Sequence, residues 1–384
     1  MGEPVDFELS EEQRELQASV RKFAATAVAP SAQERSDNLR WDADLWREFG
    51  RRRWPGVVIP KAYGGMGGGA IEHAIIVEEM SRIDCSLGAA LNLLQQTVVA
   101  VLAFAPETLK QRYLPLLASG ESFSITGITE SHAGSRLTDI KTTATPEGRG
   151  WILNGVKTEV HIPEQVQVCM MFAQAPGGLS AFLVDTATPG FRVVAQRATV
   201  GLRGLPMSAV AFDNCRVGAD NLIGGEGGAY QVFFKSFDLT RIGNAAKCIG
   251  IARGAIEDAI AYAGQRKVGE NVVTDFQGIR WQLADLDTRL EAARLLTYRA
   301  ACEYDRSGRS TVESARAKLL ASTTAMEATT IALQITGSHG CFSEFPFARY
   351  MMDAKVSQIT GGTIEILRNT IARHLVGKPT SPTA

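Results

Sequence analysis

The strongest constraint on the fold is a change of hydrophobic period part-way along the chain. In the first part, apolar residues such as Leu16, Val20 and Phe23 recur three or four positions apart, as on one face of a helix. Over about residues 121–223 they fall instead in short β-branched runs that Gly, Pro, Asn and Asp separate. That pattern is typical of antiparallel strands.

The last part of the chain returns to the helical period. Leu283, Leu286 and Leu290 mark one apolar face in a stretch rich in Ala, Leu, Glu and Arg. Helices, then strands, then helices again are typical of an α+β fold with sequentially separate layers. We therefore predict an N-terminal helical domain (1–120), a middle antiparallel β domain (121–225) and a C-terminal helical bundle (226–384).

Charge and composition argue against several classes of function. Lys and Arg (40) balance Asp and Glu (41), and no basic stripe suggests a nucleic-acid surface. No apolar run approaches the roughly 20 residues of a membrane span, and the acidic N-terminus lacks an apolar signal region, so we expect a cytoplasmic protein. The six cysteines include no C-x-x-C pair, and we expect no metal site.

Three junctions are candidates for ligand binding. Residues 127–135 (GITESHAGS) offer hydroxyls and backbone N–H groups that suit a planar ring, or else form an ordinary polar loop. Residues 333–340 (LQITGSHG) end a helix with glycines that suit a phosphate, although a glycine C-cap gives the same pattern. Gly361 and Gly362, between two amphipathic runs, make room for a turn or a ligand.

Short phrases in a fixed order carry a resemblance to one family. From residue 9 to 375 the chain resembles the acyl-CoA dehydrogenase family, which implies a four-helix bundle as the last domain, FAD held between the domains, and tetramers. The matching phrases are YGG (63–65), RYLPLLASGE (112–121), TES.AGS (129–135), LNGVKT (153–158), GLRG (201–204), NLIG (221–224), RIG (241–243), DFQ (275–277), QITG..G (334–340) and DAK..QI..GT (353–363).

The resemblance also implies roles for individual residues. Thr129 and Thr363 match contacts of the flavin ring, and Glu365 matches a position near the cofactor. Ser135 matches a position beside the thioester arm of the substrate, and Asp238 and Arg241 are further substrate-binding candidates. The positions expected to hold the FAD of a neighbouring subunit are Arg266, Gln277, Gln334 and Gly337.

The catalytic base of the family is missing. Family dehydrogenases use a glutamate, either directly before the Gly-Thr pair or directly before the arginine that here is Arg241. This chain has Gly361 at the first position and Thr240 at the second. Neither can remove a proton as a carboxylate does.

The segment that the resemblance places against the flavin also differs from the family pattern. After NGVKT the family usually has Trp-Ile-Thr-Asn, whereas this chain has the run EVHI over residues 159–162. Either the loop no longer holds a flavin, or His161 lies near the flavin and tunes or protonates it or an intermediate. Gly269, where the family usually has Phe, is a further departure.

Three hypotheses follow from these departures. The first is a flavoenzyme that needs no base, because decarboxylation of a β-keto acid generates the carbanion; reduced flavin then reacts with oxygen, as in natural-product tailoring enzymes. The second is ordinary dehydrogenation with a relocated base, for which Glu159, His161 and Asp238 are the candidates. The third is the base-lacking subunit of a heteromeric dehydrogenase. The acyl substrate is free or carried by CoA or an acyl carrier protein, and the assembly is a homotetramer or heterotetramer.

Overall fold

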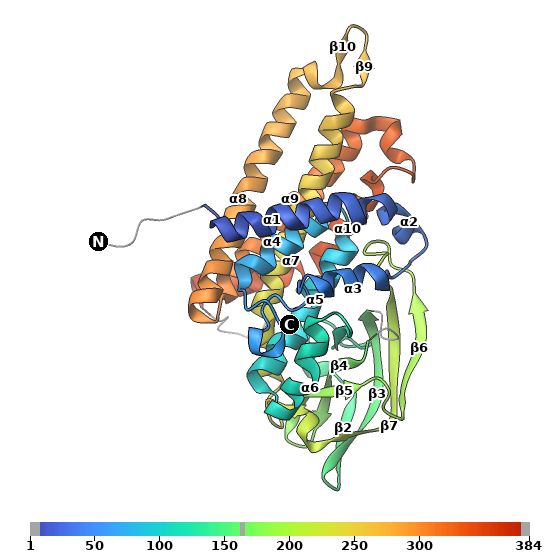
Figure 1. Cartoon of the computed structure of the whole chain (residues 1–384), viewed down its shortest axis with the longest axis vertical. Coiled ribbons are helices and arrows are strands. Elements are labelled where there is room, and N and C mark those ends of the chain that lie inside the picture. The colour runs from blue at the N-terminus through green and yellow to red at the C-terminus, as the bar shows by residue number, and fades with distance from the viewer. Residues whose placement is uncertain (1–7, 162–165, 378–384) are drawn as a thin grey trace, which may run out of the picture.

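The computed structural model describes residues 8–161 and 166–377. In Figure 1 the first helices (dark blue) cross the middle of the molecule, with the long helices of the last part extending above them and the sheet below. Ser10 and Gln13 make a reciprocal capping box that starts the first helix. The buried side chains of Val20 and Phe23 lie on the face that their spacing predicts. The helices are α1 (Glu11–Phe23), α2 (Ala32–Asp37), α3 (Ala43–Arg51), α4 (Ala70–Ser81), α5 (Cys85–Phe104) and α6 (Glu107–Ala118).

The helix α5 corrects the expectation that no apolar run is long enough for a membrane span. In the part of the chain that the structure describes, this one helix has the length and composition of such a span, with a mean hydropathy of 1.7. However, 78% of that window is buried inside the molecule. A helix that is apolar all round is the usual pattern of a core helix in a large protein.

The middle part is a sheet with the strand order β6-β7-β3-β2-β4-β5-β8. The prediction of antiparallel strands holds for most neighbours, but β1 pairs in parallel with β4, and β2 makes one parallel pairing with β4. The strands are β1 (Ser124–Gly127), β2 (Thr143–Glu147), β3 (Gly150–His161), β4 (Val168–Ala175), β5 (Gly178–Asp185), β6 (Phe191–Arg197), β7 (Met207–Gly218) and β8 (Leu222–Ile223).

Long helices form the last part, and a small hairpin lies at their far tip (Figure 1). Leu286, Leu290 and Ala293 are buried, as the apolar face predicts. The elements are α7 (Ala229–Ala263), β9 (Lys267–Val268), β10 (Asn271–Val272), α8 (Gln277–Ser307), α9 (Thr311–Thr336), α10 (Phe347–Ile359) and α11 (Ile364–Val376). Helices, a sheet and a helical bundle in this order confirm the predicted α+β class.

Small residues allow α7 to pack closely against the N-terminal helices. A Cβ added at Gly250 would lie 2.3 Å from the carbonyl oxygen of Glu78 in α4. One added at Gly243 would lie 1.9 Å from Asn92 Oδ1 in α5. The backbone of α7 therefore approaches both helices more closely than any larger residue would permit.

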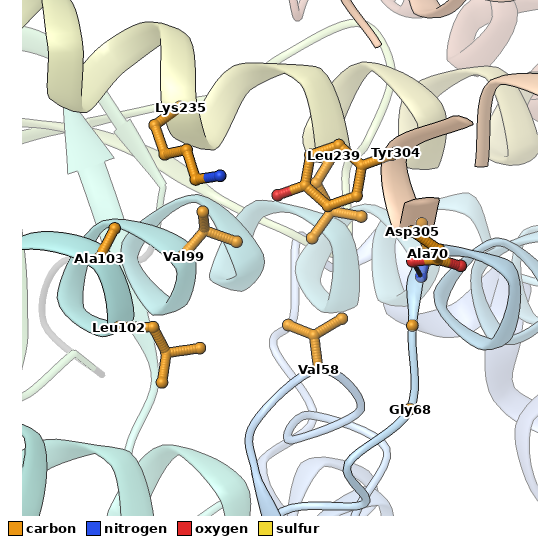
Figure 2. Close-up of a pocket in the computed structure, with 11 residues that line it drawn as sticks. Val58, Gly68, Ala70, Val99, Leu102, Ala103, Lys235, Leu239, Tyr304 and Asp305 are labelled. Atoms are coloured by element: carbon orange, nitrogen blue, oxygen red, sulfur yellow. Dashed lines mark hydrogen bonds between the residues drawn. The ribbon is translucent and has the colours of Figure 1, made fainter. Parts of the chain in front are cut away.

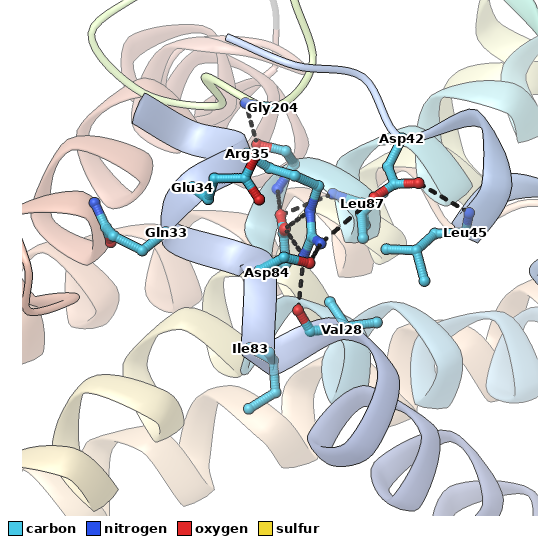
Figure 3. Close-up of polar contacts among 12 residues, drawn as sticks. Val28, Gln33, Glu34, Arg35, Asp42, Leu45, Ile83, Asp84, Leu87 and Gly204 are labelled. Atoms are coloured by element: carbon cyan, nitrogen blue, oxygen red, sulfur yellow. Dashed lines mark hydrogen bonds and ion pairs between the residues drawn. The ribbon is translucent and has the colours of Figure 1, made fainter. Parts of the chain in front are cut away.

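A buried arginine joins α2 to the start of α5 (Figure 3). The guanidinium of Arg35 donates to Asp84 Oδ2 at 2.8 and 3.1 Å and to the carbonyl of Val28 at 2.8 Å. Beside this ion pair, the N–H of Gly204 donates to Ser86 Oγ at 3.1 Å. The loop that carries Gly204 is thereby attached to the N-terminal helices.

This connection, which we name the 199–205 loop, also contacts α10. The N–H of Leu202 donates to Asp353 Oδ1 at 2.6 Å, and Arg203 Nε donates to the carbonyl of Ser36 at 2.9 Å. The loop comes from the sheet and reaches both helical parts. It therefore fixes the sheet relative to the helices on either side.

Candidate active site

The glycine junction between α10 and α11 is a tight turn. Gly361 and Gly362 have φ values of +69° and +92°, a backbone conformation that residues with a Cβ rarely adopt. Thr363 then caps α11, its hydroxyl accepting a hydrogen bond from the N–H of Ile366 at 3.4 Å. From α9, Lys318 Nζ donates to the carbonyl of Gly362 at 2.6 Å. The junction is thus held by a helix cap on one side and a buried ammonium on the other.

One face of α7 lies against this junction. A Cβ built on Gly361 would come within 2.2 Å of Asn244 Nδ2, so the amide of Asn244 fills the space where a side chain at residue 361 would begin. The hydroxyl of Thr240, at the other expected base position, donates back to the carbonyls of Ser236 and Phe237 in its own helix. No carboxylate occupies either position.

Unused polar atoms flank the same junction. Arg241 is 4% exposed, and its guanidinium carbon lies 4.7 Å from the ring centre of Phe237. Within the described ranges, Arg241 Nε and Thr360 Oγ1 are buried and have no hydrogen-bond partner. Buried polar groups are normally paired. These atoms therefore fit a polar cofactor or substrate bound at this place.

His161 ends β3 as a buried, neutral imidazole. Nδ1 lies 3.2 Å from the carbonyl of Leu205, which can only accept, so Nδ1 carries the proton and Nε2 keeps its lone pair. Burial lowers the pKa of His161 to about 4, and the hydrogen bond to Leu205 offsets this only in part. Glu159 in the same strand is exposed. Ile162, the last residue of the atypical run, lies outside the described residues.

Asp238 performs a structural task in this fold. Its Oδ2 accepts hydrogen bonds from the N–H of Ser310 and the hydroxyl of Thr311, both at 2.9 Å. Together these contacts hold the start of α9 against α7. Asp238 was a candidate base and substrate ligand, and these bonds give its carboxylate a different use.

A buried ion pair fixes the loop that follows β1, and beyond the family phrases nothing in the sequence points to it. Glu130 Oε1 accepts from Lys157 Nζ at 2.7 Å and from the hydroxyl of Thr142 at 2.5 Å. Burial alone would raise the pKa of Glu130, but Lys157 and Thr142 outweigh it and lower the value to about 2. The neighbouring Thr129 accepts from the N–H of Thr158 through its carbonyl, and Ser135 is exposed.

The residues expected to hold the FAD of a neighbouring subunit lie elsewhere. All of them are exposed, at or near the tip of the bundle that carries the β9–β10 hairpin (Figure 1). At 1.5 Å per residue, the length of α7 beyond Arg241 corresponds to roughly 33 Å. The structure therefore does not bring this group together with the glycine junction of the same chain. Its members are Arg266, Gln277, Gln334 and Gly337.

A separate cavity of about 320 Å³ opens between α5, α7 and α8 (Figure 2). Val99 and Leu239 form apolar walls, and Tyr304 lies beside them. The polar residues at its ends are already used: Lys235 Nζ donates to the carbonyl of Gly308, and Asp305 accepts from the N–H of Ala70. Sequence reasoning missed this cavity, because its walls come from four segments that are far apart along the chain: residues 58–70, α5, α7 and α8.

Comparison with known proteins gives the class that this fold and site define. Three sequence models match the chain: the acyl-CoA dehydrogenase N-terminal domain over residues 10–121, the middle domain over 126–215 and the C-terminal domain over 227–376. The chain belongs to the acyl-CoA dehydrogenase family. It is a flavin-dependent oxidoreductase, and FAD is its cofactor, as the sequence predicts.

Individual relatives match over nearly the whole length. An acyl-CoA dehydrogenase of Bacillus subtilis is 35% identical over 377 residues, covering 96% of this chain and 99% of that protein. The structure of butyryl-CoA dehydrogenase from Megasphaera elsdenii superposes with a TM-score of 0.94 at 31% identity, over 97% of this chain and 100% of that one. The prolyl acyl carrier protein oxidase AnaB gives a TM-score of 0.92 at 26% identity, over 96% and 100% of the two chains.

Proposed function

We propose that this protein oxidises an acyl substrate without the proton-abstracting glutamate of its family. The observation that carries the proposal is the occupied space at residue 361, where Asn244 Nδ2 stands 2.2 Å from the position of a Cβ. Thr240, at the alternative position, has no acidic group, and its hydroxyl is bonded within its own helix. Both expected places for a base are therefore filled by neutral groups.

Decarboxylation of a β-keto acid removes the need for a base. The bond between the carboxylate carbon and the α carbon breaks, CO₂ leaves, and the electron pair remains on the α carbon as an enolate. In a substrate with an alkyl group on the α carbon, a hydride then leaves the first carbon of that group, and the electron pair of the enolate forms a double bond between it and the α carbon. FAD, when bound, supplies the acceptor for that hydride. The protein has to orient the carboxylate and exclude water, and neither task requires a glutamate at residue 361.

The proposal has two further parts: oxygen is the final electron acceptor, and the acyl group is attached to a carrier. Oxygen as the final electron acceptor would make the protein an oxygen-using enzyme of natural-product assembly. The similarity to AnaB, whose name states that it acts on a carrier protein, supports an acyl carrier protein as a carrier beside CoA.

The test is the spectrum of the purified chain, followed by anaerobic mixing with substrates. We expect a yellow protein with about one flavin per chain. Bleaching of the flavin by β-keto acids with release of CO₂, and not by saturated acyl thioesters, would support the proposal. Bleaching by saturated thioesters alone would show ordinary dehydrogenation with a relocated base.

A second candidate, the base-lacking subunit of a heteromeric dehydrogenase, is favoured by one observation. Arg266, Gln277, Gln334 and Gly337 are all present and exposed, as a surface that holds a partner's FAD requires. Gly269, in the same region, argues against it. A chain that is colourless alone and becomes part of a yellow complex only with a second, glutamate-bearing chain would establish this alternative.

A further inference from the structure

Two buried cations, Arg241 and Lys318, lie at the junction where the family has its catalytic carboxylate, and a third, Lys247, lies further along α7. Arg241 is 4% exposed, Lys247 2% and Lys318 0%. In the part of the chain that the structure describes, none of the three forms an ion pair within 4.0 Å. Burial of a charge without a partner is costly. Such a cluster is therefore unusual in a folded protein.

Contacts place two of these cations at the glycine junction. Lys318 Nζ donates to the carbonyl of Gly362 at 2.6 Å, and Arg241 Nη2 lies 3.8 Å from the position of a Cβ on Gly362. Burial lowers the pKa of Lys318 to about 8, with the positive charges of Lys247 and Arg241 acting in the same direction. Lys318 and Arg241 therefore face the same glycine, where their like charges repel each other.

The carboxylates in this region act on the cations only from a distance. Asp238 is hydrogen-bonded to Ser310 and Thr311, and Asp353 to the N–H of Leu202. Glu365 is exposed to solvent, which screens its charge. No side-chain carboxylate of the described chain therefore contacts the guanidinium of Arg241.

Unused hydrogen-bond donors converge on the same point. Within the described ranges, the guanidinium of Arg241 donates no hydrogen bond, and its Nε is fully buried. The amide of Asn244 likewise has no hydrogen-bond partner there, and it lies against Gly361. A guanidinium presents paired N–H groups in a plane, the geometry that binds a carboxylate through two hydrogen bonds.

We infer that Arg241, assisted by Asn244 and the positive charge of Lys318, binds a free carboxylate of the substrate beside Gly361 and Gly362, at the junction where the family has its glutamate. The substrate class is then an acyl thioester whose acyl group carries a carboxylate next to the reacting carbon. This inference deepens the proposed function and rests on it, because a β-keto acid brings such a carboxylate.

The test compares two probes that differ in one carboxylate, malonyl-CoA and acetyl-CoA, by calorimetry on the purified holoprotein. We expect malonyl-CoA to bind at least tenfold more tightly than acetyl-CoA. Arg241→Gln should reduce that preference to less than about twofold, and Arg241→Lys should retain part of it. Asn244→Leu, which removes the amide at similar volume, should lower it about threefold. The matched control is Lys235→Gln on the same helix, which should keep the full preference.

Two results would overturn the inference. One is equal affinity of the wild-type protein for both probes. The other is an equal loss of affinity for both probes in Arg241→Gln with the melting temperature preserved, which would indicate a structural role. Should Arg241→Gln fail to fold, Asn244→Leu and Arg241→Lys carry the test alone. Because calorimetry does not require turnover, the two proposals can fail separately. A protein that prefers malonyl-CoA but binds no flavin would contradict the proposed oxidation and still support the carboxylate site.

Discussion

Residue 361 shows how one backbone position limits the chemistry. The φ of +69° disfavours any side chain, and Asn244 fills the adjacent space. The sequence shows only that a carboxylate is absent at residue 361. The structure adds a steric reason why a side chain does not fit there. Asn244 and residue 361 are far apart along the chain, so no local pattern could predict their contact.

Restoring a base at this position requires two substitutions. We expect Gly361→Glu alone to give no flavin bleaching with acyl-CoA, because the new side chain collides with Asn244. The double variant with Asn244→Ala should bleach measurably, and Asn244→Ala alone serves as control. Anaerobic absorbance near the flavin maximum is the measurement. A double variant that folds, holds FAD and still fails to bleach would show that the altered run around His161 limits the reaction as well.

His161 should make stability depend on pH in the acid range. Its folded pKa of about 4 lies below the ordinary histidine value of 6.5, so the unfolded chain takes up a proton first as the pH falls. Stability contributed by neutral His161 is present above about pH 6.5 and is lost between 6.5 and 4, by up to about 3 kcal/mol. Denaturant unfolding of wild type and His161→Asn at pH 7.5, 6 and 5 should give a difference that shrinks as the pH falls. A constant difference would contradict the burial of a neutral imidazole.

At the scale of elements, the hydrophobic period correctly predicts which parts of the chain form helices and which form strands, and in what order. The long face of α8 and the start of α1 follow from local spacing and capping, because both depend on neighbours a few residues away. Two features do not follow. The parallel pairing of β1 with β4 depends on strands that come together only in the fold, and an all-apolar helix such as α5 has the same local pattern in a core and in a membrane.

The Glu130–Lys157 pair should hold the loop after β1 in place. Glu130→Gln keeps the shape but leaves the ammonium of Lys157 buried without its counter-charge. We expect a loss of about 3 kcal/mol or more in the free energy of unfolding. The double variant with Lys157→Met should regain most of it. A double variant as unstable as the single one would show that hydrogen bonds to the loop backbone, and not the charge pair, dominate.

The close approach of α5 and α7 gives a second prediction at this scale. Gly243→Ala raises helix propensity, yet its Cβ would stand 1.9 Å from Asn92 Oδ1 and 2.5 Å from His73 Nε2. We expect a net destabilisation of roughly 1–3 kcal/mol by thermal or denaturant unfolding. Gly278→Ala in α8 is the matched control, since no atom lies within 4 Å of its added Cβ. Equal effects of the two substitutions would contradict the close packing.

At the scale of the whole molecule, the tip of the bundle presents apolar side chains to solvent. Trp281 is 62% exposed, Phe276 43% and Phe342 60%, close to the predicted contacts for a neighbouring subunit's FAD. We propose that this tip is covered by another subunit. Trp281→Glu should convert the assembly to a smaller species in light scattering and lower its flavin content together. Val194→Glu, at an exposed position of the edge strand β6, is the control. An unchanged mass for Trp281→Glu would place the interface elsewhere.

The contact between Asn244 and Gly361 also bears on the history of the protein. A mutation that restores glutamate at residue 361 meets the amide of Asn244, and one that removes Asn244 first brings no base by itself. Neither first step offers selection an immediate gain in dehydrogenation. The two positions are therefore coupled: either substitution alone brings no working base, and only the pair opens residue 361 to a glutamate.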